Sequence, residues 1–128
     1  MEKMRLGRTN LMVSTSGFGA LPIQRVSFEE ASHLLNKAYE NGINFFDTAR
    51  GYTDSEAKMG QALAHARQNI IIATKTGATD RTTFFQDLET SLKNLKTDYI
   101  DIYQLHNPKV LPDPDSPDDL YGALLEAR

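Results

Sequence analysis

The sequence predicts an α/β fold built on a parallel sheet, and three observations lead to that class. Short apolar runs alternate with segments of helical period, so that a strand-then-helix unit occurs four times. The run NIIIATK at 69–75 is apolar up to its lysine, as in a strand buried on both faces. The runs begin near positions 12, 43, 69 and 98, close to the roughly 31 residues of one unit in an eight-unit (β/α) barrel.

The first unit begins with MVSTSGFGA at 12–20, which we predict to be a strand that ends in glycines. The helix after it has Ser27 and Glu30 in the S-x-x-E order of an N-terminal capping box. Gly42 lies just beyond this helix and suits a C-terminal cap. The residues at the spacing of one helix face are Ala31, Leu34, Leu35 and Ala38.

The second unit has its strand at 43–47, INFFD, and its helix should begin near Asp54 or Ser55. The residues that this helix should turn inward are Met59, Ala62, Leu63 and Ala66. The third unit has its strand at 69–75 and a helix that starts near Thr83, where Gln86 completes another capping box. The stripe of this third helix consists of Phe85, Leu88, Leu92 and Leu95.

The fourth unit has its strand at 98–106, DYIDIYQLH, followed by a loop rich in proline and aspartate. Ser116, Pro117 and Asp119 then have the order of an N-cap, a first helical position and an acidic third position. The fourth helical stripe starts with Leu120, Leu124 and Ala127.

Two architectures satisfy this order: an open doubly wound sheet and a (β/α) barrel. If the fold is a barrel, 128 residues hold four of its eight units. Four strands cannot close a barrel, so an isolated chain would leave two strand edges and the inner face open. The Gly17-Phe18-Gly19 sequence lacks the third glycine of a Rossmann fingerprint and supports the open dinucleotide fold only weakly.

Composition narrows the function classes. The chain is 40% hydrophobic and 24% charged with a net charge of -3, so we expect neither nucleic acid nor an anionic membrane as a partner. It has no cysteine, which excludes disulfides and thiolate chemistry. The charged N-terminus does not resemble a secretory signal, and no apolar run approaches the length of a membrane span. The three histidines are not spaced like the ligands of a metal site. From the N-terminus and the absence of a membrane span we expect a cytoplasmic protein.

Four polar residues mark a candidate active site. Asp47, Lys75 and His106 each end a predicted strand, and Tyr52 lies just beyond the second. Active sites of both architectures lie at the carboxyl ends of the strands, where these groups would converge. Each has a structural explanation on its own: a turn aspartate, a packed tyrosine, a solvated lysine and a strand-end histidine. A lysine buried at a strand end needs an acid, however, and Asp47 is the obvious partner.

These residue types suit one kind of chemistry together. A nearby ammonium favours a phenolate and so makes Tyr52 a better proton donor near neutral pH. Asp47 would keep Lys75 charged, and His106 could polarise a carbonyl. The set suits protonation of the oxygen that develops when a carbonyl accepts hydride. Because no side chain supplies hydride, a nicotinamide cofactor is implied.

The same segments resemble a known family in order and spacing. GINFFDTARGYTDSE, IIIATKTG and SLKNLKTDYIDIYQLHNP resemble the aldo-keto reductase segments that carry the catalytic aspartate and tyrosine, the lysine and the histidine. MRLGRTNLMVSTSGFGALP resembles the family's opening, a hairpin that plugs the barrel bottom. The resemblance runs from residue 1 to residue 128 and matches only the N-terminal half. It implies a (β/α)8 TIM-type barrel, with a hairpin region at 1–12 and four βα units at 13–128.

The resemblance also implies roles. Tyr52 is the general acid, Lys75 and Asp47 support it, and His106 orients the carbonyl of an aldehyde or ketone. Asn107 is a further expected substrate contact. The expected cofactor is NADPH, with NADH as the alternative, and its nicotinamide ribose should lie near Asp47 and the stretch Gly19, Ala20 and Leu21.

The resemblance has two departures, and it leaves alternatives open. The family often has glycine directly after the tyrosine, where this chain has Thr53. Threonine is less favourable than glycine at positive φ, so we expect a different local turn. Most cofactor contacts belong to the half that this chain does not contain. The alternatives to an enzyme fragment are a half barrel that is active only as an assembly, and a non-catalytic interaction module.

Overall fold

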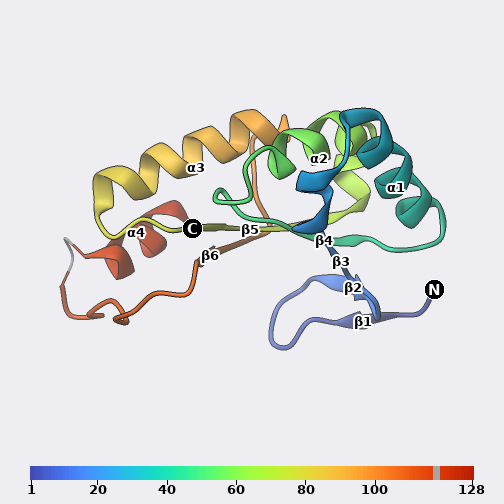
Figure 1. Cartoon of the computed structure of the whole chain (residues 1–128). Helices are drawn as coiled ribbons and strands as arrows, with labels where there is room; N and C mark the ends of the chain where they lie inside the picture. Colours follow the sequence, from blue (N-terminus) through green and yellow to red (C-terminus); the bar gives the residue numbers. More distant parts are fainter. Residues whose placement is uncertain (117–118) are drawn as a thin grey trace.

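The structure is a computed structural model that describes residues 1–116 and 119–128 (Figure 1). A hairpin of β1 (Lys3–Arg5) and β2 (Met12–Ser14) precedes a four-stranded sheet. The strands of the sheet are β3 (Phe18–Gly19), β4 (Phe45–Asp47), β5 (Ile71–Thr76) and β6 (Ile102–Leu105). The α-helices are α1 (Phe28–Glu40), α2 (Ser55–Leu63), α3 (Arg81–Leu95) and α4 (Leu120–Ala127). Two 3-10 helices are η1 (Pro22–Arg25) and η2 (Ala64–Asn69).

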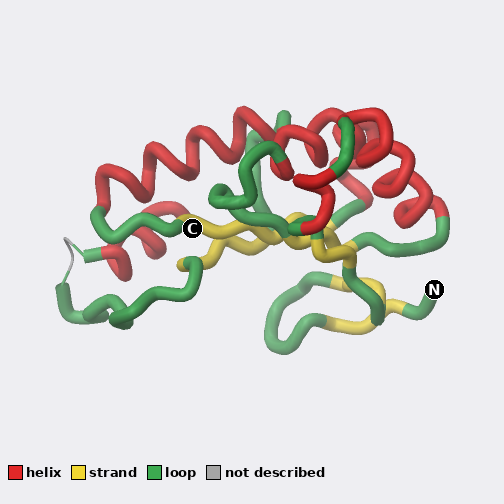
Figure 2. Tube along the Cα trace, viewed as in Figure 1, coloured by secondary structure: helices red, strands yellow, loops and turns green. Residues whose placement is uncertain are grey.

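The sheet is parallel throughout, and its spatial order β3-β4-β5-β6 is also its chain order. Each crossover therefore moves to the next strand in the same direction, whereas a doubly wound sheet reverses direction at a switch point. Helices α1, α2 and α3 lie along one face of the sheet (Figures 1 and 2). This arrangement is four βα units of a (β/α) barrel, as the resemblance implied, and it excludes the doubly wound alternative.

The apolar core lies between the helices and the face of the sheet that they cover. Phe46 and Ile72 belong to a buried cluster with residues of α1 and α2, among them Leu35 and Met59. A second cluster joins α3, α4 and β6 around Phe84. Because side chains alternate along a strand, the neighbours of Phe46 and Ile72 in sequence point to the opposite, inner face. No described helix covers that inner face.

The predicted strand at 12–20 is two strands that belong to different sheets. Met12–Ser14 pairs antiparallel with β1, and Phe18–Gly19 pairs parallel with β4. The chain bends between them, where the Ser14 hydroxyl donates to the Ser16 carbonyl at 2.6 Å. The hairpin therefore extends to Ser14, two residues beyond the expected boundary at residue 12.

One buried side chain joins the hairpin to the sheet. Asn44 Oδ1 accepts from the Ser14 amide at 2.6 Å, and its Nδ2 donates to the Met12 carbonyl at 2.9 Å. The Asn44 amide in turn donates to the Ser14 hydroxyl at 3.1 Å. The Asn44 side chain thus makes the hydrogen bonds to β2 that a neighbouring strand would make. These bonds hold the hairpin next to the start of β4.

Helix α1 begins and ends where the sequence indicates, and α2 begins where it indicates. The Ser27 hydroxyl accepts from the Glu30 amide at 3.0 Å, which confirms the capping box of α1. Gly42 has φ +97, and the amides of Gly42 and Ile43 donate to the carbonyls of Tyr39 and Ala38, the pattern of a Schellman cap. Helix α2 begins at Ser55, and the four residues predicted to turn inward are all buried, but Ala66 lies beyond the end of α2, in η2.

Helices α3 and α4 begin elsewhere than predicted. Asp80, not Thr83, caps α3, because its carboxylate accepts from the Thr83 amide at 2.8 Å. Asp119, not Ser116, caps α4 by accepting from the Leu120 amide at 2.7 Å. The first-turn proline expected at Pro117 lies outside the described residues.

Two of the predicted helix stripes also need correction. Leu34 lies at the margin of the stripe of α1 and is 40% exposed. In α3 the fully buried aromatic residue is Phe84 rather than Phe85, because Phe84 packs edge-on against Tyr103 of β6 with 5.4 Å between ring centroids.

None of the described helices has both the length and the hydropathy that a bilayer crossing requires.

The substitution Asn44→Ala is expected to lower the free energy of unfolding by about 1–3 kcal/mol, because it leaves the buried Ser14 amide without an acceptor. Urea denaturation measures this loss, and the amides of β1 and β2 should exchange faster with solvent. The matched control is Asn41→Ala, which removes one exposed bond to the Lys37 carbonyl and should cost about 0.5 kcal/mol or less. Equal losses at the two positions would contradict the assigned role of Asn44.

The cap of α3 predicts a dependence of stability on acid. Hydrogen bonds from the Thr83 amide and hydroxyl hold the pKa of Asp80 below its ordinary value of 3.8. A lowered folded-state pKa stabilises the fold above the unfolded-state pKa, and this stabilisation disappears as pH falls through the folded-state value. Asp80→Asn keeps a capping oxygen that does not titrate. The stability difference between wild type and Asp80→Asn should therefore shrink below about pH 4 in urea titrations; a difference independent of pH would argue against the cap.

Candidate active site

The carboxyl ends of β4, β5 and β6 bring three of the predicted residues to one rim. Asp47 is the last residue of β4, and Lys75 is the penultimate residue of β5. His106 directly follows β6, and its amide donates to the Thr76 carbonyl at 2.8 Å, which extends the ladder by one residue. Because the strands are parallel and in register, their polar ends meet on the inner side of the sheet.

Lys75 is paired as its position requires. Its Nζ lies 2.7 Å from Oδ2 of Asp47 and 2.7 Å from the Thr48 carbonyl oxygen. The lysine side chain is 16% exposed, whereas that of Asp47 is 41% exposed. The ammonium is therefore held between an acid and a backbone acceptor, and the acid retains a face open to solvent.

Tyr52 comes from the loop after β4 and lies against both other groups. Lys75 Nζ is 5.3 Å from the centroid of the Tyr52 ring. The rings of Tyr52 and His106 meet edge to face, with 5.5 Å between centroids and an interplanar angle of 84°. All four predicted catalytic residues thus gather at one place, where a phenol, an ammonium and an imidazole border the same open side. Such a set can donate protons and hydrogen bonds to an oxygen atom.

The loop that carries Tyr52 is held like an extension of the sheet. The amides of Thr48 and Arg50 donate to the carbonyls of Ala73 and Lys75, both at 2.9 Å. The Ser55 hydroxyl bonds the Thr48 hydroxyl and the Ala20 carbonyl, both at 2.8 Å, which links the loop to the end of β3. The loop therefore has little freedom, although it has no regular secondary structure.

Thr53 keeps the left-handed turn that was expected to differ. Its φ is +44, in the region where a β-branched residue is strained. Three contacts hold it there: Arg50 Nη2 donates to the Thr53 carbonyl at 3.1 Å, and the Thr53 hydroxyl lies 2.9 Å from Gln24 Oε1 and 3.4 Å from Asp54 Oδ1. The turn after Tyr52 is thus maintained by its neighbours rather than by a glycine.

The sequence predictions do not include three residues of this region, Arg50, Glu56 and Thr74. Glu56 is fully buried and pairs with Arg50, and it also accepts from the Thr74 hydroxyl at 2.9 Å. One sequence signal could have revealed it: Glu56, Met59 and Leu63 follow the spacing of a single helix face, so an acid lies on an apolar stripe.

The expected cofactor stretch lies at the end of β3, beside Asp47. The site where a Gly19 side chain would begin has no other heavy atom within 4 Å, so the backbone there is open. Ala20 is fully buried, and its amide donates to the Asp47 carbonyl at 2.8 Å. Leu21 is exposed. Asn107 adjoins His106 on the exposed loop that follows β6 and has φ +45.

A second tyrosine of the same region belongs to the other face. Tyr103 of β6 packs with α3 and α4, and burial raises its pKa well above the ordinary value of 10. It therefore does not compete with Tyr52 as a proton donor at the rim. In the described part of the chain, no group of three or more histidine or acidic side chains is arranged to hold a metal ion.

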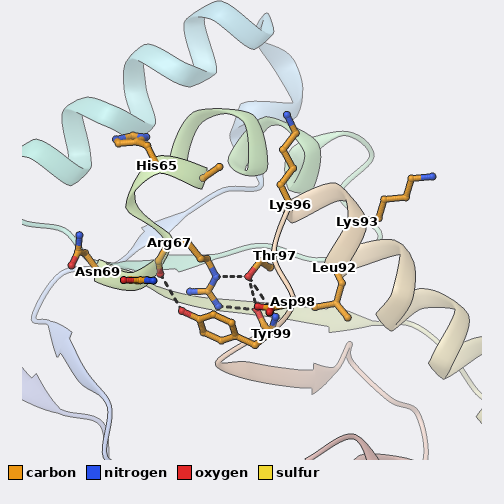
Figure 3. Close-up of a pocket in the computed structure, with 11 residues that line it drawn as sticks. His65, Arg67, Asn69, Leu92, Lys93, Lys96, Thr97, Asp98 and Tyr99 are labelled. Carbon is orange, nitrogen blue, oxygen red and sulfur yellow. Dashed lines mark hydrogen bonds between the residues drawn. The ribbon is translucent and has the colours of Figure 1, made fainter.

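A surface hollow at the opposite end of the sheet has a structural explanation (Figure 3). Its central cation, Arg67, donates to Thr97 Oγ1, the Tyr99 carbonyl and Asp101 Oδ2, each at 2.9 Å. The guanidinium also stacks 3.9 Å from the centroid of the Tyr99 ring. The side chains of Lys93 and Lys96 extend away from the hollow (Figure 3). The hollow thus reflects how Arg67 ties η2 to the start of β6.

Known proteins match most of this chain. The model of the aldo/keto reductase family matches residues 12–127. An uncharacterized oxidoreductase of Bacillus subtilis, YqkF, is 35% identical over 83% of this chain and 39% of its own length. A probable voltage-gated potassium channel subunit beta of Arabidopsis thaliana is 35% identical over 84% of this chain and 38% of its own.

Among solved structures, the holo form of an aldo-keto reductase from Bacillus halodurans has a TM-score of 0.87 and 34% identity, and the match covers 98% of this chain and 46% of that one. The chain therefore spans about two fifths of the length of the curated relatives it matches.

The strained turn leads to a prediction about Thr53. Thr53→Gly should be more stable than Thr53→Ala by about 1 kcal/mol, because both lose the hydroxyl but only glycine relieves the positive φ. Thr79 is exposed and is not among the residues with positive φ, so there the order should reverse, with alanine favoured by about 0.5–1 kcal/mol. Urea denaturation of the four variants checks this; the same order at both positions would exclude strain at Thr53.

Proposed function

Because this chain belongs to the aldo/keto reductase family, we propose that it carries the proton-donating rim of an oxidoreductase that reduces aldehydes or ketones to alcohols. The observation that supports the proposal most is the contact of Tyr52 with both Lys75 and His106. A binding module has no need of this combination, whereas a carbonyl reductase uses each group.

The residues near β3 and β4 suit a nicotinamide cofactor, and we assign NADPH, with NADH as the alternative. The open backbone at Gly19 leaves room for a flat ring beside the rim. Asp47 presents a partly exposed carboxylate, which can accept from a ribose hydroxyl. We assign the neighbouring contacts to the backbone of Ala20 and Leu21. When bound, the cofactor supplies the hydride that is transferred to the carbonyl carbon.

Tyr52 acts as the general acid in this proposal. Its phenol donates a proton to the carbonyl oxygen, on which negative charge develops as the carbon is reduced. Lys75 lies beside the ring and stabilises the phenolate that proton donation leaves behind. Asp47 and the Thr48 carbonyl hold the ammonium in place, so that it need not reorganise during the reaction.

His106 orients the substrate. Its ring meets Tyr52 edge to face, so an oxygen atom near the phenol also lies within reach of the imidazole. A hydrogen bond from the imidazole polarises the carbonyl and directs its oxygen toward Tyr52. Asn107 follows His106 and is assigned as a second contact to the substrate.

A second candidate function is an interaction module that does not turn over substrate. It is favoured by the relative named as a potassium channel subunit beta, which is as similar to this chain as the oxidoreductase is. The uncovered inner face of the sheet would then be the docking surface. Turnover of a carbonyl substrate distinguishes the two candidates.

The first candidate predicts that the chain binds NADPH and reduces a simple aromatic aldehyde. Cofactor fluorescence measures binding, and consumption of NADPH measures turnover. Tyr52→Phe should lower kcat about a hundredfold or more and leave NADPH affinity nearly unchanged, because it removes only the proton donor.

Tyr121→Phe is the matched control, since this partly exposed tyrosine lies on α4, outside the rim, and its loss should leave both measurements unchanged. If Tyr52→Phe turned over aldehyde at the wild-type rate, Tyr52 would not be the acid. If the wild-type chain bound no NADPH at any protein concentration, this chain alone would not be the enzyme.

A further inference from the structure

A carboxylate that the proposed reaction does not use lies directly behind the rim. Glu56 is in the first turn of α2, four residues after Tyr52, and it is 0% exposed. Acidic residues near helix N-termini are usually solvated, and a buried carboxylate is unfavourable unless its charge and both oxygens are satisfied. Its burial therefore requires partners whose charge and hydrogen bonds offset the loss of hydration.

Both oxygens of Glu56 have such partners, and the partners come from different elements. Oε1 pairs with the guanidinium of Arg50, which lies in the loop two residues before Tyr52. Oε2 accepts from the Thr74 hydroxyl at 2.9 Å, and Thr74 is a fully buried residue of β5. Glu56 thus ties the loop that carries Tyr52 to the strand that carries Lys75.

The strand holds this loop from both of its faces. Thr74 and Lys75 are consecutive, so their side chains point to opposite sides of the sheet. On the inner side Lys75 Nζ donates to the Thr48 carbonyl at 2.7 Å, and on the outer side Thr74 donates to Glu56. Between them the Arg50 amide donates to the Lys75 carbonyl at 2.9 Å.

The Arg50 side chain extends the same network to the turn after Tyr52. Its Nη2 donates to the carbonyl of Thr53, the residue with φ +44. Loss of Glu56 would leave the guanidinium without its acid and free to turn toward solvent. The strained turn would then lose one of the contacts that hold it.

We propose that Glu56 is a positioning residue, which fixes the Tyr52 ring against Lys75 and His106 through Arg50 and Thr74. Its relevance to catalysis rests on the function proposed above, in which Tyr52 is the acid. The geometric statement stands on the contacts alone. Glu56 acts through other residues and does not itself touch the substrate.

Three substitutions distinguish what each contact of Glu56 contributes. Glu56→Leu removes both hydrogen bonds without leaving a large cavity. Thr74→Val is isosteric and removes only the link to β5. Glu56→Gln removes the charge but can keep both bonds, because its oxygen accepts from Arg50 while its amide donates to the reoriented Thr74 hydroxyl. Glu56→Gln is therefore the conservative variant that should preserve the position of Tyr52.

The readout is the ring contact between Tyr52 and His106, measured by nuclear Overhauser cross-peaks in the 128-residue chain and assigned with Tyr52→Phe. The edge-to-face contact at 5.5 Å between centroids predicts a clear cross-peak in the wild type. We expect it to be lost in Glu56→Leu, weakened in Thr74→Val and retained in Glu56→Gln.

The control is Arg67→Met, which breaks the largely buried ion pair with Asp101 at the opposite end of the sheet. This variant should be destabilised but should keep the cross-peak, because it does not touch the Tyr52 loop. Loss of the cross-peak in Glu56→Leu but not in Arg67→Met therefore reports position rather than general stability.

Persistence of the cross-peak in folded Glu56→Leu would overturn the proposal. If that variant fails to fold, Thr74→Val decides alone, and an unchanged cross-peak there overturns the proposal as well. Where the wild type turns over aldehyde, Thr74→Val should lower kcat about tenfold while KM for the aldehyde changes little. An inactive wild type refutes the proposed function for this chain, but it leaves the ring contact as a valid test of Glu56.

Discussion

The register between β4 and β5 is the constraint on which the rest of the rim depends. Asp47 lies opposite Ala73, and Phe46 lies opposite Ile72. In this register Asp47 and Lys75 share the open face, while the aromatic ring of Phe46 is buried under the helices. A slip by one residue would turn the ammonium of Lys75 into the apolar core and the ring of Phe46 out of it. Because burial of an unpaired charge is so unfavourable, the residues that meet at the rim also secure the alignment of the sheet.

The catalytic tyrosine of the proposed function lies in a loop, yet the loop has the order of a strand. Its amides at Thr48 and Arg50 continue the hydrogen-bond ladder with β5. Buried polar side chains on the outer face add further fixed points, and a half-satisfied network of this kind would be worse than an apolar core. The structure therefore holds Tyr52 by the same physical means that hold its sheet, and a precise site needs such support.

Much of this arrangement can be predicted from the sequence, because the signals are local. The capping box of Ser27, the glycine after α1 and the polar residues at strand ends each act within a few positions. The failures arise where local signals are ambiguous. The stretch 12–20 has one continuous strand pattern, and nothing within it tells that its two halves pair with different partners. Asp80 and Thr83 are both good caps, and only the completed helix shows that the carboxylate is the acceptor. Glu56 looks like an ordinary acid at a helix start, since its burial depends on Arg50 and Thr74, which are brought to it by the fold.

The described helices cover only one face of the sheet, and this asymmetry has a thermodynamic consequence. The inner face is lined by half-buried apolar residues, including Phe45, Ile71 and Ile102, and the outer edges of β3 and β6 have no neighbouring strand among the described residues. A second copy of the chain that docked on this face would bind only the folded form. By mass action its contribution grows with its concentration, so the melting temperature of such a half barrel describes the solution it is in as well as the chain itself.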